Sequence, residues 1–131
     1  MISSDLDRVR EMYDAWNNGN VDRMIEFWWD DATWEDAPET PDRQIIRGRE
    51  NVEAHLRDTI EVMGELEMEV IELEELGAEI LGSVQVRVVG SASGISLDVL
   101  AYHLIRFEGG RVRSYRMFTT REHALEAAES G

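Results

Sequence analysis

The segment Ile95-Ser96-Leu97-Asp98-Val99-Leu100-Ala101-Tyr102-His103-Leu104-Ile105-Arg106-Phe107 predicts one long β-strand. Because successive side chains of a strand point to opposite faces, one face is apolar except for a single imidazole: Leu97, Val99, Ala101, His103, Ile105 and Phe107. We expect this face to pack against helices. There His103 needs either a hydrogen-bond partner in the core or a ligand, and the sequence leaves both open.

The period of two continues on both sides of this segment. Before it, 66–76 and 80–89 are predicted strands, and Gly90-Ser91-Ala92-Ser93-Gly94 is a predicted hairpin loop. After it, Glu108-Gly109-Gly110-Arg111 indicates a tight hairpin, and 112–119 form the last predicted strand. The strand at 66–76 and the residue before it carry six acids: Glu65, Glu67, Glu69, Glu72, Glu74 and Glu75. They lack the spacing of an oxygen-ligand loop, so we predict a solvated strand face and no metal site.

The first half of the chain has helical spacing instead, and three helices are predicted there. The first follows a Ser4 cap and ends at 17–20, where Gly19 adopts positive φ at little cost. The second has an apolar face formed by Val21, Met24, Ile25 and Trp28. The third runs between Gly48 and Gly64, with a stripe formed by Val52, Leu56, Ile60 and Met63. Residues 39–47 are predicted to form a loop, and 121–129 a short terminal helix or a frayed end.

The element order is therefore helix, helix, a short strand at 33–35, helix and a four-stranded antiparallel meander. Helices gathered on one face of an antiparallel sheet predict a single α+β domain spanning 1–131. The other face of the long strand carries Leu100, Tyr102 and Leu104, with no further helix expected to cover them. An uncovered apolar row predicts a homodimer that forms through the outer face of the sheet.

A second informative stretch is Trp28-Trp29-Asp30-Asp31-Ala32-Thr33-Trp34-Glu35-Asp36-Ala37-Pro38. Residues 33–35 favour a strand, so Trp34 and Asp36 point to the same side, and Pro38 ends the pairing. A carboxylate against aromatic surface is partly desolvated, which raises its pKa toward the range of a useful base. The alternative is that Asp36 only begins a loop.

Composition narrows the range of partners. The 131 residues carry a net charge of −15, which disfavours binding to nucleic-acid phosphates and to anionic membranes. There is no cysteine, so disulfides, thiolate nucleophiles and cysteine-ligated metals are excluded. No apolar run reaches membrane-spanning length, and 1–5 lack the features of a signal peptide, so we expect a cytoplasmic protein.

Four motifs accompany this element order: Trp16-Asn17-Asn18-Gly19-Asn20, Asp30-Asp31-Ala32-Thr33-Trp34-Glu35-Asp36, Gly48-Arg49-Glu50 and Leu104-Ile105-Arg106-Phe107-Glu108-Gly109-Gly110-Arg111-Val112. Together they resemble the nuclear transport factor 2-like superfamily, which includes ketosteroid isomerases, SnoaL-like polyketide cyclases and limonene epoxide hydrolases. The resemblance implies a cone-shaped roll, in which a curved mixed or antiparallel sheet wraps three helices around an internal pocket. Because this fold hosts many activities and also non-enzymes, it does not fix a function.

The resemblance also implies roles for individual residues. Asp36 matches the general base of ketosteroid isomerase, although Ala37 separates it from the proline of the family's Glu-Asp-Pro motif. His103 falls at the position of the family's protonated aspartate. Met12 falls at the position of its oxyanion-binding tyrosine, one residue before Tyr13. The resemblance therefore implies that this chain keeps the base as Asp36, has His103 in place of the aspartate donor, and lacks the tyrosine donor.

We expect a cofactor-free enzyme of isomerase or cyclase type that acts on a hydrophobic carbonyl compound. Proton abstraction beside a carbonyl needs a base near the carbon and a donor near the oxygen, and Asp36 and His103 are the catalytic candidates. Met117 stands where the resemblance to cyclases and epoxide hydrolases implies an acid. The candidates for substrate binding are Met12, Tyr13, Trp16, Trp34, His55, Tyr115 and Met117. The alternative is a ligand- or partner-binding domain without turnover, which the missing tyrosine favours.

Overall fold

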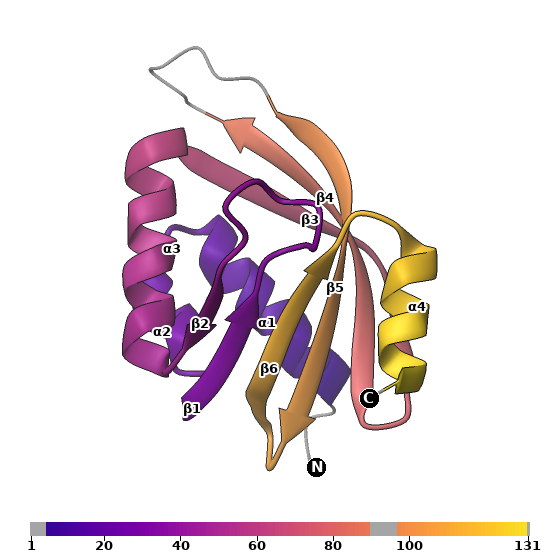
Figure 1. Ribbon diagram of the computed structural model, residues 1–131. Helices are drawn as coiled ribbons and strands as arrows, with labels where there is room; N and C mark the ends of the chain where they lie inside the picture. Colours follow the sequence, from indigo (N-terminus) through magenta and orange to yellow (C-terminus); the bar gives the residue numbers. More distant parts are fainter. Residues whose placement is uncertain (1–4, 90–96, 131) are drawn as a thin grey trace.

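The computed structural model describes residues 5–89 and 97–130 (Figure 1). The helices are α1 (Asp5–Asn17), α2 (Val21–Ile25), α3 (Arg49–Met63) and α4 (Arg121–Ser130). The strands are β1 (Trp28–Glu35), β2 (Ile45–Arg47), β3 (Glu65–Leu76), β4 (Glu79–Val89), β5 (Asp98–Glu108) and β6 (Arg111–Phe118). The predicted α+β class is confirmed. The predicted Ser4 cap and the hairpin loop at 90–94 lie outside the described residues.

The strands form a sheet in the order β2-β1-β6-β5-β4-β3. The predicted antiparallel meander from β3 to β6 is confirmed. β1 joins it beside β6 in parallel, which makes the sheet mixed. The sheet is strongly twisted, with α1, α2 and α3 on one face and α4 against the other (Figure 1).

Two boundaries differ from the prediction. α2 ends at Ile25, and Trp28 begins β1, where it is fully buried. Apolar residues continue from this short helix into the strand, so spacing alone does not separate them. The strand β2 (Ile45–Arg47) pairs with β1 inside the predicted loop. Three residues are too few to display a period of two.

The inner face of β5 packs as predicted except at Val99, which is 45% exposed. Ile105 and Phe107 are buried in the main core together with side chains of α1, α2 and α3. Leu97 and Ala101 are partly buried against the same core, and His103 is 1% exposed. The strand therefore directs its apolar side, with the one imidazole, toward the helices.

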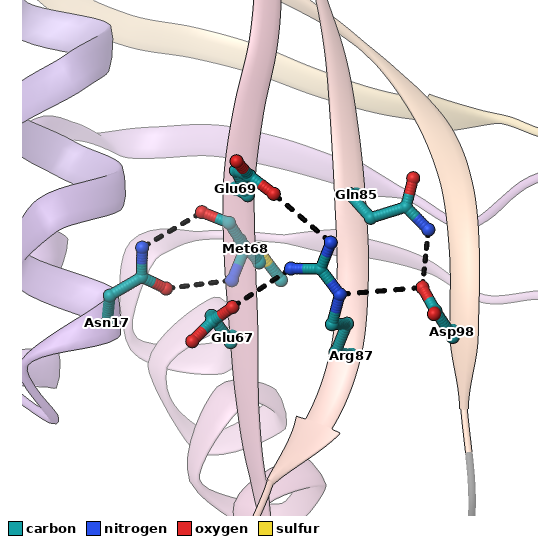
Figure 2. Close-up of polar contacts among 7 residues, drawn as sticks. All are labelled: Asn17, Glu67, Met68, Glu69, Gln85, Arg87 and Asp98. Atoms are coloured by element: carbon teal, nitrogen blue, oxygen red, sulfur yellow. Dashed lines mark hydrogen bonds and ion pairs between the residues drawn. The ribbon is translucent and has the colours of Figure 1, made fainter.

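Two side chains at the end of α1 attach it to β3, which is an edge strand of the sheet. The Trp16 indole N–H donates to the carbonyl of Leu66 at 2.7 Å. The Asn17 amide donates to the Met68 carbonyl at 2.9 Å and accepts from the Met68 N–H at 2.8 Å (Figure 2). Such an amide satisfies the unpaired backbone groups of an edge, as a neighbouring strand would. The motif at 16–20 therefore sets the position of α1 against the sheet.

The acidic strand β3 is partly neutralised by its neighbour. Arg87 of β4 contacts Glu67 at 3.0 Å, Glu69 at 3.1 Å and Asp98 of β5 at 3.6 Å (Figure 2). Exposed ion pairs are weak because water and salt screen them, so this network mainly relieves repulsion between carboxylates. Within 5–89 and 97–130, no three potential metal ligands lie together, and no helix is long and apolar enough to cross a bilayer.

α4 covers part of the outer face, so the expectation of an uncovered apolar row is wrong. Leu104 is fully buried in a second small core, which contains three further side chains from β4, β6 and α4: Leu81, Phe118 and Ala124. Tyr102 packs against this core, whereas Leu100 stays 43% exposed. The alanine-rich face of α4 carries little periodic signal, so its docking could not be predicted. A homodimer through this face stays a prediction, restricted to the open end of the row at Leu100.

The coverage by α4 predicts unequal effects of two substitutions on one face of β5. Leu104→Ala should lower the free energy of unfolding by about 2 kcal/mol, the low end of the usual range, because a small core under one helix can partly collapse. Leu100→Ala should lower it by less than about 1 kcal/mol, since that side chain is largely solvated. Chemical denaturation measures both. Equal losses would contradict the burial of Leu104 by α4.

Candidate functional site

A cavity of about 240 Å³ lies between the inner face of the sheet, α1 and α3. Its walls are mostly apolar and include Trp16, Leu56, Met68, Val86, Ala101 and Met117. Asp36 and His103, the two predicted catalytic residues, both line it. An apolar cavity with a few convergent polar groups is the usual form of a small-molecule site.

Asp36 follows the last residue of β1 and is half-buried. Its backbone N–H donates to the Gln44 carbonyl at 3.0 Å, which closes the loop between β1 and β2. One carboxylate oxygen, Oδ1, accepts from the Trp34 indole N–H at 3.0 Å, and Oδ2 accepts from the Gln44 N–H at 3.1 Å. Trp34 and Asp36 therefore lie together, as alternation along the strand predicts. The two donors fix the orientation of the carboxylate at the cavity wall.

His103 has two internal partners and also lines the cavity. Its Nδ1 atom lies 2.6 Å from the hydroxyl of Tyr13 on α1 and 2.5 Å from the hydroxyl of Tyr115 on β6. The two hydroxyl oxygens are 2.9 Å apart. Three buried polar groups from three elements thus satisfy one another, and one of them remains in the cavity wall.

The geometry of this triad assigns the tautomer of His103. A neutral imidazole has one donor and one acceptor nitrogen. If Nδ1 accepts, one tyrosine donates to Nδ1 and the other donates to that tyrosine, so both hydroxyl protons are used. If Nδ1 carries the proton, one hydroxyl proton is left without an acceptor inside the triad, which is costly when buried. We therefore assign the proton to Nε2, on the basis of the hydrogen-bond network.

Burial decides the charge of these groups. It lowers the pKa of His103 to about 3, because apolar surroundings disfavour the imidazolium. It also raises the pKa of the Tyr13 and Tyr115 hydroxyls above their ordinary value, since a buried phenolate would be poorly solvated. All three groups are neutral at pH 7, and His103 is available there as a neutral donor.

The lowered pKa of His103 predicts a loss of stability in acid. The unfolded chain binds a proton at this residue below about pH 6.5, whereas the folded chain binds it only near pH 3. Between these values, falling pH favours unfolding by about 1.4 kcal/mol per pH unit. We expect wild type to lose this much more stability per unit than His103→Gln between pH 5.5 and 4, in denaturation measured at each pH. Parallel curves would mean that His103 titrates normally in the folded protein.

Stacked rings connect the two candidate catalytic groups. The Trp34 and Tyr115 ring centroids lie 4.7 Å apart with an interplanar angle of 10°, and Tyr115 lies 4.9 Å from the His103 ring. The indole N–H of Trp34 holds Asp36, and the hydroxyl of Tyr115 contacts His103. One aromatic pair therefore positions both groups. His55 meets the edge of Trp34, with centroids 5.4 Å apart and an angle of 61°.

The predicted substrate-binding residues divide into two groups. Four line the cavity: Trp16, Trp34, His55 and Met117. Tyr13 and Tyr115 instead lie behind His103, and Met12 is fully buried in the main core. The resemblance placed Met12 at the position of the family's tyrosine, but in the structure it is the next residue, Tyr13, that reaches His103. Consecutive side chains of a helix point about 100° apart, so only one of the two can face His103. Tyr13 places a hydroxyl beside His103 but does not line the cavity, so the expected loss of an oxyanion-binding tyrosine stays a prediction.

Several wall residues were not predicted from the sequence. They continue two patterns that contain predicted residues, namely the inner face of β5 around His103 and the helical stripe that follows His55. Steps of two residues back from His103 reach Ala101, Val99 and Leu97, and steps of four residues on from His55 reach Thr59 and Met63.

Solved structures share this architecture. An NTF2-like protein of unknown function from Burkholderia pseudomallei is 22% identical, with 95% of this chain and 97% of that chain covered and a TM-score of 0.78. The epoxide hydrolase/cyclase-like enzyme SalBIII is 18% identical, with 90% and 92% covered and a TM-score of 0.75. A hypothetical protein with a ketosteroid isomerase-like fold from Catenulispora acidiphila is 15% identical, with 92% and 91% covered and a TM-score of 0.70. At these identities the likeness shows the fold alone.

The family follows from the sequence itself. The profile of the SnoaL-like domain matches residues 9–115, which span most of the chain from α1 to β6. No curated protein matches the sequence. The chain belongs to the SnoaL-like domain family, and it has the fold of the NTF2-like protein described above.

Proposed function

We propose that the protein is a cofactor-free enzyme that transfers a proton on a hydrophobic carbonyl compound, as an isomerase or a cyclase. The observation that carries this proposal is that Asp36 and His103 line the same apolar cavity. Proton abstraction beside a carbonyl requires a base and a hydrogen-bond donor in one water-poor site. A carboxylate and a neutral imidazole are groups of these two kinds.

The proposed reaction begins when Asp36 takes a proton from the carbon next to the carbonyl. The electron pair of that C–H bond forms the enolate, and the Nε2–H of His103 donates to its oxygen. In an isomerisation, Asp36 returns the proton to another carbon of the conjugated system. In a cyclisation, the enolate carbon bonds to a second carbonyl carbon, and the oxygen of that carbonyl takes the proton from Asp36.

The surroundings of the two groups support these roles. Each oxygen of Asp36 accepts one hydrogen bond, which leaves further lone pairs to receive a proton. Tyr13 and Tyr115 hold the proposed tautomer of His103 from behind the wall. Among proteins of similar fold, SalBIII is described as a cyclase-like enzyme that acts in pyran ring formation. That likeness shows that a related fold can hold a cyclase-like enzyme, and it defines neither the reaction nor the substrate of this chain.

A second candidate function is binding without turnover. It is favoured by the hydrogen bonds of Asp36 to the backbone of Gln44, which are those of a residue that closes a loop. In that case the cavity would hold a hydrophobic ligand, and Asp36 would only shape the loop between β1 and β2. The two candidates share the pocket and differ in whether bound ligand loses a proton.

A thermal-shift screen of ketones and lactones tests whether the cavity takes such compounds. We expect some of them to raise Tm of the wild type, because a ligand that binds only the folded state stabilises it. Ala101→Phe fills part of the cavity and should abolish the shift, whereas Leu100→Phe lies on the opposite face of β5 and should preserve it. No shift with any carbonyl compound, or an equal shift in Ala101→Phe, would count against the proposal.

A further inference from the structure

A second hollow adjoins the proposed substrate cavity. It has a volume of about 510 Å³ and lies between α3 and the segment 44–46. The two spaces share three wall residues of α3, which are His55, Thr59 and Met63. These three side chains border both spaces, and they form the common rim that a ligand extending from the cavity into the hollow would cross.

The inner cavity is too small to enclose a ligand of ordinary size. Its volume of about 240 Å³ is below the range of roughly 300–1,000 Å³ that is usual for small-molecule pockets. A compact ring system with its carbonyl group fits inside. Any further part of the molecule must project past the rim.

We propose that the substrate has two parts, a compact apolar ketone in the cavity and an extension in the hollow that donates hydrogen bonds and carries no negative charge. This inference rests on the proposed function, because it assigns the inner part to the carbonyl compound. The extension is a hydroxyl-bearing or ammonium-bearing group. The hollow is therefore a second subsite that selects among ketones by what they carry.

The chemistry of the hollow sets the nature of the extension. Asn51 donates its amide N–H to the Arg47 carbonyl at 2.8 Å, and Thr59 donates its hydroxyl to the His55 carbonyl at 2.8 Å. The hydroxyl proton of Thr59 and one N–H of Asn51 are thus used, and the oxygens of both side chains remain as acceptors. Asp58 adds a carboxylate, and among the described wall residues of the hollow there is no lysine or arginine. The Asp58 carboxylate, with no cation beside it among the described residues of this wall, attracts hydrogen-bond donors and repels anions.

His55 links the two subsites to the catalytic machinery. Its ring packs on the edge of Trp34, whose indole N–H is bonded to Asp36. A ligand that crosses the rim therefore contacts His55, which packs on Trp34, and Trp34 is hydrogen-bonded to Asp36, the proposed base. This places the extension where it can position the ketone relative to Asp36.

Isothermal titration calorimetry with a matched set of ketones tests the inference. The probes are 1-tetralone and its 6- and 7-substituted derivatives with a 2-hydroxyethoxy, 2-aminoethoxy or carboxymethoxy chain. For at least one position, we expect the hydroxyl or ammonium chain to tighten Kd about tenfold relative to 1-tetralone, since hydrogen bonds to charged groups contribute this much. The carboxymethoxy chain should weaken binding. The two donor chains distinguish a hydroxylated from a cationic extension.

Two variants of α3 locate the effect. Asp58→Asn should remove most of the gain, whereas Glu61→Gln removes the same charge from an exposed residue outside the hollow and should preserve it. Three results with 1-tetralone bound would refute the second subsite and leave the proposed function standing. These are no improvement of Kd by any donor chain, equally tight binding of the carboxylate chain and the donor chains, and a gain that survives Asp58→Asn. If 1-tetralone itself does not bind, the proposed function fails and the inference fails with it.

Discussion

Replacing His103 by asparagine is expected to slow proton exchange on a bound ketone by about 100- to 1,000-fold, the usual effect of removing one oxyanion donor. The asparagine amide ends near the position of Nδ1, so it can still bond to Tyr13 and Tyr115. It has no group at the position of Nε2. Because the hydrogen bond to the substrate strengthens as charge develops on oxygen, kcat should fall while KM changes little.

His103→Gln is the matched comparison for this variant. The longer glutamine side chain places an amide N–H near the position of Nε2, so it should recover much of the lost rate. Both variants remove the imidazole from the core, so the comparison isolates the position of the amide. Wild-type exchange in the asparagine variant would show that His103 is only a hydrogen-bond partner of the two tyrosines.

Asp36→Asn is expected to lower the same exchange rate by about 100-fold or more, because the amide cannot accept the proton. Hydrophobic ketones should still bind, since the shape of the wall is kept. The structure adds a further consequence. The amide oxygen can accept from Trp34, but the amide N–H₂ then faces the Gln44 N–H, so one hydrogen bond is lost. We expect a loss of about 1 kcal/mol in unfolding free energy.

Asp42→Asn controls for a change of charge and side chain in the same loop. Asp42 is exposed and has a φ of 54°, a conformation that asparagine also adopts readily. This variant should keep both the exchange rate and the stability of the wild type. If Asp36→Asn reduces stability but exchanges as fast as Asp42→Asn on a ligand that binds equally, then Asp36 closes the loop and is not a base.

The parts of the site that the sequence predicted are those built from a single strand. Alternation along 95–107 placed His103 on the face toward the helices, and alternation along β1 placed Asp36 beside Trp34. In both cases the relevant neighbours are two residues apart. A period of two is enough to bring such side chains to one surface.

The parts that could not be predicted depend on contacts between distant elements. The hydroxyls of Tyr13 and Tyr115 reach His103 from α1 and β6, and nothing in the local pattern indicates that meeting. A one-residue shift in the helix decided whether Met12 or Tyr13 was expected there. The docking of α4 on Leu104 likewise depends on tertiary packing, because helical spacing defines a face but not its partner.

The most direct test of the central claim is hydrogen–deuterium exchange at the α-carbon of a ketone that demonstrably binds, followed by NMR in deuterated buffer. It requires no knowledge of the natural product. We predict that the wild type exchanges this proton far faster than buffer alone, and that a variant with both Asp36→Asn and His103→Asn falls to the rate of buffer. Exchange at the buffer rate by wild-type protein saturated with the ketone would contradict the proposed proton transfer and leave a binding domain.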